Sequence, residues 1–86
     1  MIVDNIIDLD ILQTKIHPNP TKEFLNIELK KGLAASVSLK DFNGKTVLTK
    51  VINDEDQIDI ESLPDGVYLL LIETELGSWI ERVVKM

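Results

Sequence analysis

The chain has 86 residues, of which 44% are hydrophobic, and this is enough for one domain with a single small core. Its formal net charge of −6 opposes binding to nucleic-acid phosphates or to anionic lipid, because both depend on clustered lysine and arginine, so we expect neither as a partner. The sequence has no cysteine, which excludes disulfides and thiolate metal sites.

Residues 1–14 allow two structural interpretations. Ile7, Leu9 and Ile11 alternate with polar residues as in a strand, but the apolar residues of the same segment also fit one stripe of a helix. The segment contains no lysine or arginine, so it lacks the basic start of a signal peptide. We interpret residues 1–14 as a linker or an edge strand, and residues 15–86 as the domain.

The first clear turn signal is Pro18-Asn19-Pro20. Two prolines so close together exclude a helix or a central strand, and they stiffen the chain. The motif predicts a corner that leads into a strand over residues 24–29. In that strand the apolar residues alternate with polar ones and predict one buried face: Leu25, Ile27 and Leu29.

A hairpin is predicted around Asp41-Phe42-Asn43-Gly44-Lys45. Asn and Gly tolerate the positive φ angles that a tight hairpin requires. The preceding segment alternates Val37 and Leu39 with polar residues, as a half-buried strand does. We therefore expect residues 36–41 to pair antiparallel with residues 46–51.

The next predicted strand, residues 57–61, places Ile58 and Ile60 on one buried face. It is followed by Leu63-Pro64-Asp65-Gly66, in which proline occupies the second turn position, where its fixed φ is already correct. The chain should therefore reverse direction at this turn and continue into a strand over residues 67–74.

Residues 67–72 are apolar on both faces of a strand, which predicts a central strand covered on both sides. A buried helix is the competing interpretation, but the run is short and follows a turn. The run is also far shorter than the roughly 20 residues that a membrane helix needs. If the central strand is covered in this way, Leu71→Asp should place an unpaired charge in the core and cost much of the stability.

A last turn at Leu76-Gly77-Ser78 leads into a strand over residues 79–85, in which Ile80 and Val84 share one face and Val83 lies on the other. Short strands separated by turns at this spacing predict an all-β fold. We expect an immunoglobulin-like antiparallel β-sandwich of about seven strands, with a small open barrel as the alternative.

The sequence contains no recognisable catalytic, metal or cofactor site. The single histidine, His17, precedes a proline, and none of the serines at 36, 38, 62 and 78 has the Gly-x-Ser-x-Gly context of a nucleophile. Asp54-Glu55-Asp56 lacks the spaced ligands and the glycine of a calcium loop, so it should form a solvated turn. Glycine-rich phosphate loops are absent. We expect neither an enzyme nor a cofactor.

Two aromatic residues, Tyr68 and Trp79, raise the question of a sugar-stacking platform. Tyr68 lies inside the most apolar segment, so we expect it in the core with its hydroxyl reaching an edge. The position of Trp79 is open. An immunoglobulin-like adhesive or glycan-binding module is therefore the alternative function to the one that follows from the motifs.

Four segments of the chain form an ordered set: Pro18-Asn19-Pro20-Thr21 before Phe24-Leu25-Asn26-Ile27, then Val37-Ser38-Leu39-Lys40-Asp41 with Gly44-Lys45, then Leu63-Pro64-Asp65-Gly66-Val67-Tyr68-Leu69-Leu70, and finally Val83-Val84-Lys85. Each segment alone is ordinary turn or strand chemistry. In this order, spacing and terminal position they resemble the type A C-terminal sorting domain of the type IX (Por) secretion system of Bacteroidetes. The resemblance covers residues 15–86.

This resemblance implies a folded secretion signal and no enzyme. Members of the family are the C-terminal parts of larger cargo proteins, which cross the inner membrane by a signal peptide of their own. The domain then directs the cargo through the type IX translocon in the outer membrane, and a surface peptidase-transpeptidase cuts the domain off. Residues 1–14 would be the junction to the cargo. The expected location is the periplasm in transit, and afterwards the cell surface or the medium.

The resemblance also marks candidate recognition residues in the corner, the two turns and the final strand: Pro18, Asn19, Pro20, Asp41, Gly44, Lys45, Leu63, Pro64, Gly66, Val67, Tyr68, Val84 and Lys85. For each residue taken singly, a role in building the fold is the alternative, because glycine and proline meet special backbone needs. We further expect the final strand to offer its edge for strand addition to a partner.

Overall fold

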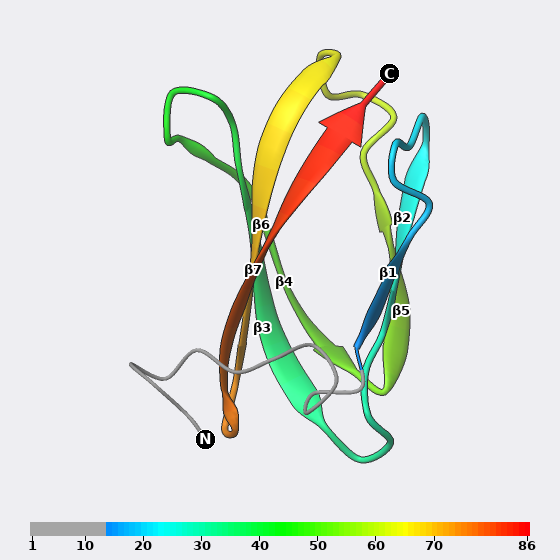
Figure 1. The fold of residues 1–86 in the computed structure, drawn as a ribbon, viewed down its shortest axis with the longest axis vertical. Coiled ribbons are helices and arrows are strands. Elements are labelled where there is room, and N and C mark those ends of the chain that lie inside the picture. The colour runs from blue at the N-terminus through cyan, green and yellow to red at the C-terminus, as the bar shows by residue number, and fades with distance from the viewer. Residues whose placement is uncertain (1–13) are drawn as a thin grey trace.

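A computed structural model describes residues 14–86, which form two antiparallel sheets that face each other (Figure 1). This part of the chain contains strands and turns but no helix, and therefore no helix that could span a membrane. Its strands are β1 (Lys15–His17), β2 (Phe24–Glu28), β3 (Ala34–Lys40), β4 (Thr46–Asn53), β5 (Glu55–Asp59), β6 (Gly66–Thr74) and β7 (Gly77–Lys85).

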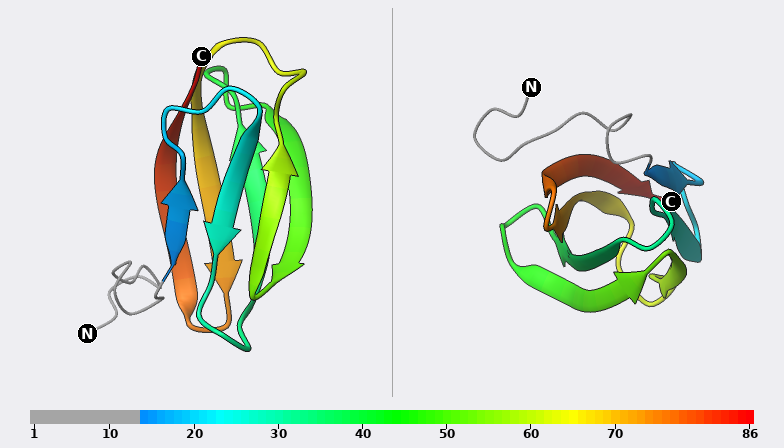
Figure 2. Two further views of the ribbon diagram at one scale, coloured as in Figure 1. Left: turned by 90° about the vertical axis from the view of Figure 1, so that its right-hand side faces the viewer. Right: turned by 90° about the horizontal axis from the view of Figure 1, so that it is seen from below.

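The strand order is β1-β2-β5 in one sheet and β4-β3-β6-β7 in the other. In Figure 2, left, the three-stranded sheet lies in front of the four-stranded one. A constant-type immunoglobulin domain places its fourth strand beside the fifth, whereas here β4 pairs with β3. The structure thus confirms a seven-stranded immunoglobulin-like sandwich, with the fourth strand moved to the other sheet, and not a barrel.

The core lies between the two sheets and consists of the inward-facing residues of both. Every second residue of the predicted half-buried strands is buried there, as expected: Leu25, Ile27, Leu29, Val37, Leu39, Ile58 and Ile60. Each such side chain contributes about 1.5–3 kcal/mol when it leaves water. The period-two alternation in the sequence therefore identifies the buried face of these strands correctly.

The hairpin between β3 and β4 forms as predicted, with Ser38 opposite Thr49 in antiparallel register. Gly44 adopts a φ of 83°, which a residue with a side chain rarely tolerates. The Asp41 carboxylate accepts hydrogen bonds from the backbone N–H groups of Asn43 and Lys45, at 2.9 and 3.0 Å. The turn is thus held by its own first residue.

The turn at residues 63–66 reverses the chain direction as expected, but it does not join neighbouring strands. β5 pairs with β2 in one sheet, while β6 lies between β3 and β7 in the other. The turn therefore crosses from one sheet to the other at the end of the sandwich (Figure 1).

β6 confirms the predicted strand over residues 67–72 and its central place in a sheet, but the expectation that both of its faces are covered is wrong. Leu70 is buried, whereas Val67 and Leu69 are 42% and 48% exposed and Leu71 is only half-buried. A sandwich has two layers, so even an inner strand is covered on one face only. Leu71 is therefore not a core residue, and the expected effect of Leu71→Asp applies to Leu70.

β7 forms a hairpin with β6, in which Thr74 lies opposite Gly77. Val83 is fully buried, while Ile80 is 53% exposed and Val84 is half-buried on the outer face, as the alternation predicts. The interpretation of residues 1–14 as a linker or edge strand concerns positions outside the described residues, apart from Thr14.

Candidate recognition surface

The corner, the turns and the chain end of the motif segments lie at one end of the sandwich, and we call it the motif end. It consists of the corner at residues 18–21, the hairpin turn at 41–45, the turn at 63–66 and the chain end at 84–86. In Figure 1 these segments lie together at the top of the molecule. The strands β1, β3, β5 and β7 run toward this end, so segments far apart in the sequence meet there.

The corner at residues 18–21 lies along the outer edge of β7. The Asn19 side chain takes the place of a peptide group: its Oδ1 accepts a hydrogen bond from the Val84 N–H at 3.0 Å, and its Nδ2 donates to the Arg82 carbonyl at 2.7 Å. Both peptide bonds that precede the prolines, at Pro18 and Pro20, are cis. The side chain of Asn19 thus holds the backbone of the last strand.

Thr21 continues this contact with its own backbone. Its N–H donates to the Val84 carbonyl, and its carbonyl accepts from the Met86 N–H, both at 2.9 Å. The Thr21 side chain is buried, and its hydroxyl donates to the Phe24 carbonyl. The edge of β7 from residue 82 onward is therefore paired within the chain. The expectation that this part of the last strand is free for strand addition is wrong, because Asn19 and Thr21 occupy its hydrogen-bonding groups.

The turn at residues 63–66 is fixed from below by Tyr68. The ring of Tyr68 is buried, and its hydroxyl donates to the Pro64 carbonyl, which confirms a core residue whose hydroxyl reaches an edge. A tyrosine at the start of the sixth strand that bonds to backbone just upstream is a hallmark of immunoglobulin-like sandwiches. Tyr68 therefore builds the fold and presents little surface to a partner.

Lys85 joins the same turn to the last strand. Its side chain is only 8% exposed, and its Nζ lies 3.2 Å from the Asp65 carboxylate, which is 74% exposed. The lysine is therefore covered by the fold, and its charge is paired with the exposed carboxylate. Of this pair, Asp65 is the residue that a partner can contact directly.

A shallow hollow separates the 41–45 hairpin from the 63–66 turn, and Phe42, Leu63, Pro64 and Val67 contribute to its lining. Phe42 is 92% exposed, which makes it the most prominent apolar side chain of the motif end. Phe42 is not among the candidate recognition residues predicted from the sequence. The sequence feature that could have pointed to it is a single aromatic residue inside a polar Asn-Gly turn, where no core contact requires one.

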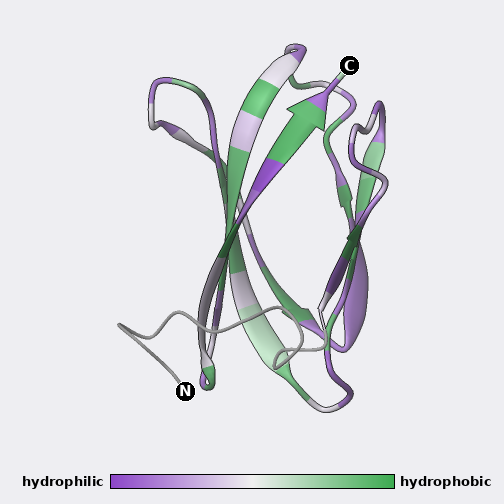
Figure 3. Ribbon diagram, viewed as in Figure 1, coloured by the Kyte–Doolittle hydropathy of each residue, from purple (hydrophilic) through white to green (hydrophobic). Residues whose placement is uncertain are grey.

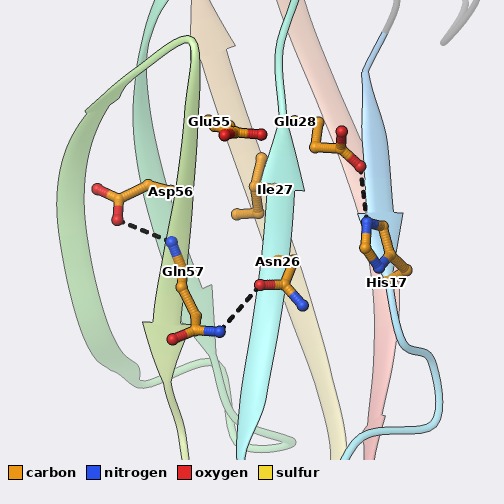
Figure 4. A pocket seen from close by; sticks show the side chains of 7 residues that line it. All are labelled: His17, Asn26, Ile27, Glu28, Glu55, Asp56 and Gln57. Atoms are coloured by element: carbon orange, nitrogen blue, oxygen red, sulfur yellow. Dashed lines mark hydrogen bonds and ion pairs between the residues drawn. The ribbon is translucent and has the colours of Figure 1, made fainter.

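A second, polar groove crosses the outer face of the β1-β2-β5 sheet (Figure 4). His17 Nε2 lies 2.7 Å from the Glu28 carboxylate, and Gln57 Nε2 donates to Asn26 Oδ1 at 3.1 Å. These side chains pair with one another. Among residues 14–86 the structure shows no group of three or more acidic or histidine side chains that could hold a metal ion.

The acidic run at residues 54–56 also spreads its side chains over separate partners. Asp54 accepts from the Gly32 N–H at 2.6 Å, and Asp56 pairs with Lys50 at 3.2 Å. The Gln57 backbone N–H, and then Lys50, hold the pKa of the Asp56 carboxyl below its ordinary value. The run therefore acts within the fold and does not converge on a common point.

The two aromatic residues considered for a sugar platform do not form one. Trp79 is half-buried against the core, and its indole N–H donates to a Glu81 carboxylate oxygen at 3.1 Å. Because Tyr68 is buried on the same inner side of the sheet, the two rings present no shared exposed face.

The fold and the motif end define a small immunoglobulin-like β-domain whose motif residues shape turns and hold the last strand. A family model described as the secretion system C-terminal sorting domain matches residues 15–86, and the chain belongs to this family. The resemblance seen in the motifs is thereby confirmed. No curated protein matches the chain.

Membership in this family carries four consequences. The domain is a C-terminal sorting signal for type IX secretion. Such a signal implies a larger cargo protein and the type IX machinery, and it implies export to the cell surface or beyond. The family is not catalytic.

Proposed function

We propose that residues 15–86 direct a larger cargo protein through the type IX translocon across the outer membrane, and that a surface peptidase-transpeptidase then removes them. The match to the sorting-domain family over residues 15–86 carries this proposal. Residues 1–14 serve as the junction to the cargo. The cargo passes through the periplasm and ends at the cell surface or in the medium. The domain itself has no enzymatic activity.

The direction of the chain supports a role for the motif end in recognition. β1 runs toward the motif end (Figure 1). Its first residue, Lys15, is therefore the residue of β1 that is farthest from the motif end. A cargo attached before Lys15 therefore leaves the motif end uncovered. We propose that the export machinery contacts this end of the domain.

Within the motif end, the candidate recognition residues fall into two groups. Asn19, Gly44, Tyr68 and Lys85 are engaged in hydrogen bonds, turn geometry or burial, so they hold the surface in shape. The exposed candidates, such as Pro18 and Lys45, are offered to a partner, together with Asp65, which the motifs did not select. We propose that the first group acts through the fold and the second by direct contact.

A reporter fusion tests the proposed function. Residues 1–86 are fused behind a periplasmic reporter in a Bacteroidetes host that carries the type IX system, and reporter is measured at the surface and in the medium. We expect export with the domain and none without it. The same fusion carrying Leu70→Asp, which disrupts the core, serves as the control for a folded signal. Retention of the reporter in the periplasm with an intact, folded domain contradicts the proposal.

A further inference from the structure

The outer face of the four-stranded sheet carries an aliphatic surface that residues 14–86 leave partly exposed. We call it the outer patch: Val67, Leu69 and Leu71 of β6, with Ile80 and Val84 of β7. The register places Val67 beside Val84 and Leu71 beside Ile80, with Leu69 between these pairs. Val67, Leu69 and Ile80 are 42%, 48% and 53% exposed. Figure 3 shows β6 as a largely hydrophobic strand.

Such a surface is unusual on the outside of a sandwich. The solvent-facing side of an antiparallel sheet normally carries polar residues, and contiguous exposed apolar patches mark interaction sites. Turn chemistry and strand pairing do not require aliphatic residues at these outward positions. The patch therefore indicates a binding site for a partner.

The patch is also held in a fixed shape. β6 is hydrogen-bonded on both sides, to β3 and to β7. The end of β7 is fixed again by Asn19 and Thr21 on its other edge. A partner thus meets a surface that needs little ordering on binding, which favours affinity.

Positive charge flanks the centre of the patch. Lys40 of β3 and Arg82 of β7 stand on either side of Leu69 in one cross-strand row, and both are exposed. In the outward-facing rows of Val67, Leu69 and Leu71, the partners of β6 on β3 and β7 include no acidic residue, and the next outward-facing row contains Glu73 of β6. This composition contrasts with the net charge of −6 of the whole chain.

The charges identify the kind of occupant. A second copy docked face to face through a two-fold axis would bring the Lys40 and Arg82 side chains of both copies together, and like charges in an interface are costly. An anionic membrane would be repelled by the acidic chain as a whole. We propose that the outer patch docks a different protein of the export machinery, one that presents aliphatic side chains flanked by carboxylates. This inference rests on the proposed sorting function.

Export of the reporter fusion tests the patch. The double variant Leu69→Thr/Ile80→Thr removes the aliphatic contact with β-branched residues that suit an exposed strand position. We expect export to fall about five- to tenfold, since it removes two central contacts of the interface. The matched control is Val51→Thr: Val51 is 70% exposed on the same outer face but lies in the row of Ser36, away from the patch. It should export like the wild type.

A charge series separates contact from folding. Arg82→Glu should reduce export to a similar extent. Arg82→Lys keeps the positive charge, so its export should equal that of the wild type. Circular dichroism melting of each purified chain checks that the variants fold. Equal export of wild type, Leu69→Thr/Ile80→Thr and Arg82→Glu, all folded, overturns the docking proposal and leaves the sorting function standing. Failure of the wild-type fusion to export overturns both.

Two measurements on the purified chain check the identity of the occupant. Sedimentation of the wild type should show a monomer, and a dimer that disappears in Leu69→Thr/Ile80→Thr would assign the patch to a second copy. Vesicles of phosphatidylglycerol should not bind the chain, and binding that Arg82→Glu abolishes would assign the patch to lipid. Either result overturns the proposed protein partner.

Discussion

At the scale of single residues, Asn19 shows how one side chain can complete a sheet edge. Its amide offers one acceptor and one donor with the spacing of a peptide group, and it uses both on β7, at the Val84 N–H and the Arg82 carbonyl. The residue lies in a corner whose two prolines lack N–H groups and so cannot donate to β7 themselves. The asparagine side chain therefore pairs with β7 beside the prolines, and the backbone of Thr21 continues the pairing.

We predict that Asn19→Ala lowers the free energy of unfolding by about 1–2 kcal/mol, because two hydrogen bonds to the last strand are lost. Asn19→Asp should cost more, since it replaces the donor that faces the Arg82 carbonyl with a charged acceptor. Urea unfolding and amide exchange of Val84 measure the effect. Asn43→Ala, in an exposed turn, is the control. Unchanged exchange at Val84 in Asn19→Ala would show that the side chain does not hold β7.

Asp56 gives a prediction for pH. Its pKa is lowered by the Gln57 N–H first and by Lys50 second. A lowered pKa in the folded state stabilises the fold above the ordinary carboxyl pKa, and this contribution is lost as the pH falls through the lowered value. Lys50→Met should raise the Asp56 pKa without restoring its ordinary value, because the larger cause remains. Carboxyl ¹³C NMR titration measures it, with Lys45→Met as control; an unchanged pKa in Lys50→Met would contradict the assignment.

At the scale of elements, β6 is the strand in which pattern and environment differ most. It is apolar on both faces, is paired on both edges and has one face in the core. Its inner residues stabilise the sandwich. Its outer residues contribute less to folding and remain available to a partner, which is why the outer patch and the core can be altered separately.

The two faces of β6 should respond very differently to truncation. We predict that Leu70→Ala costs about 2–5 kcal/mol, as a large-to-small change at a fully buried site, while Leu71→Ala costs clearly less because its side chain is half-buried. Urea unfolding of both variants measures the difference. Equal costs would mean that the outer face of β6 is covered after all.

At the scale of the whole molecule, the chain end is part of the fold and not an appendage. Val83 is fully buried, Lys85 bonds to Asp65, and Thr21 pairs with residues 84 and 86. The last strand is thus tied to the corner, to the turn at residues 63–66 and to the core. A signal at the end of this chain cannot be altered without regard to its role in stability.

Two truncations test this arrangement. Removing residues 82–86 should abolish cooperative unfolding, because it deletes Val83 and leaves the corner without its partner strand. A chain that begins at Thr14 should still unfold cooperatively, since the family match begins at Lys15. Circular dichroism melting measures both. A cooperative transition near that of the full chain after removal of 82–86 would contradict the role assigned to the last strand.

The sequence alone determined the local features of this protein. Alternation at positions such as Leu25 and Ile27 predicts strands and their buried faces, because a strand repeats every two residues wherever it lies. Asn43-Gly44 predicts its hairpin, because a positive φ is a property of the residue itself. The order of the motifs identified the family for the same reason, since it depends on residue types and spacing and not on contacts.

Only the tertiary structure decided the contacts between distant parts of the chain. The sequence could not show that Asn19 binds residues 82 and 84, which are 63 and 65 positions away. Nor could it show that β5 and β6 separate into different sheets, or that Leu70 is buried while Leu69 is exposed. An apolar strand has the same sequence pattern whether one or both of its faces are covered. The covering depends on the other layers of the molecule and not on the strand itself.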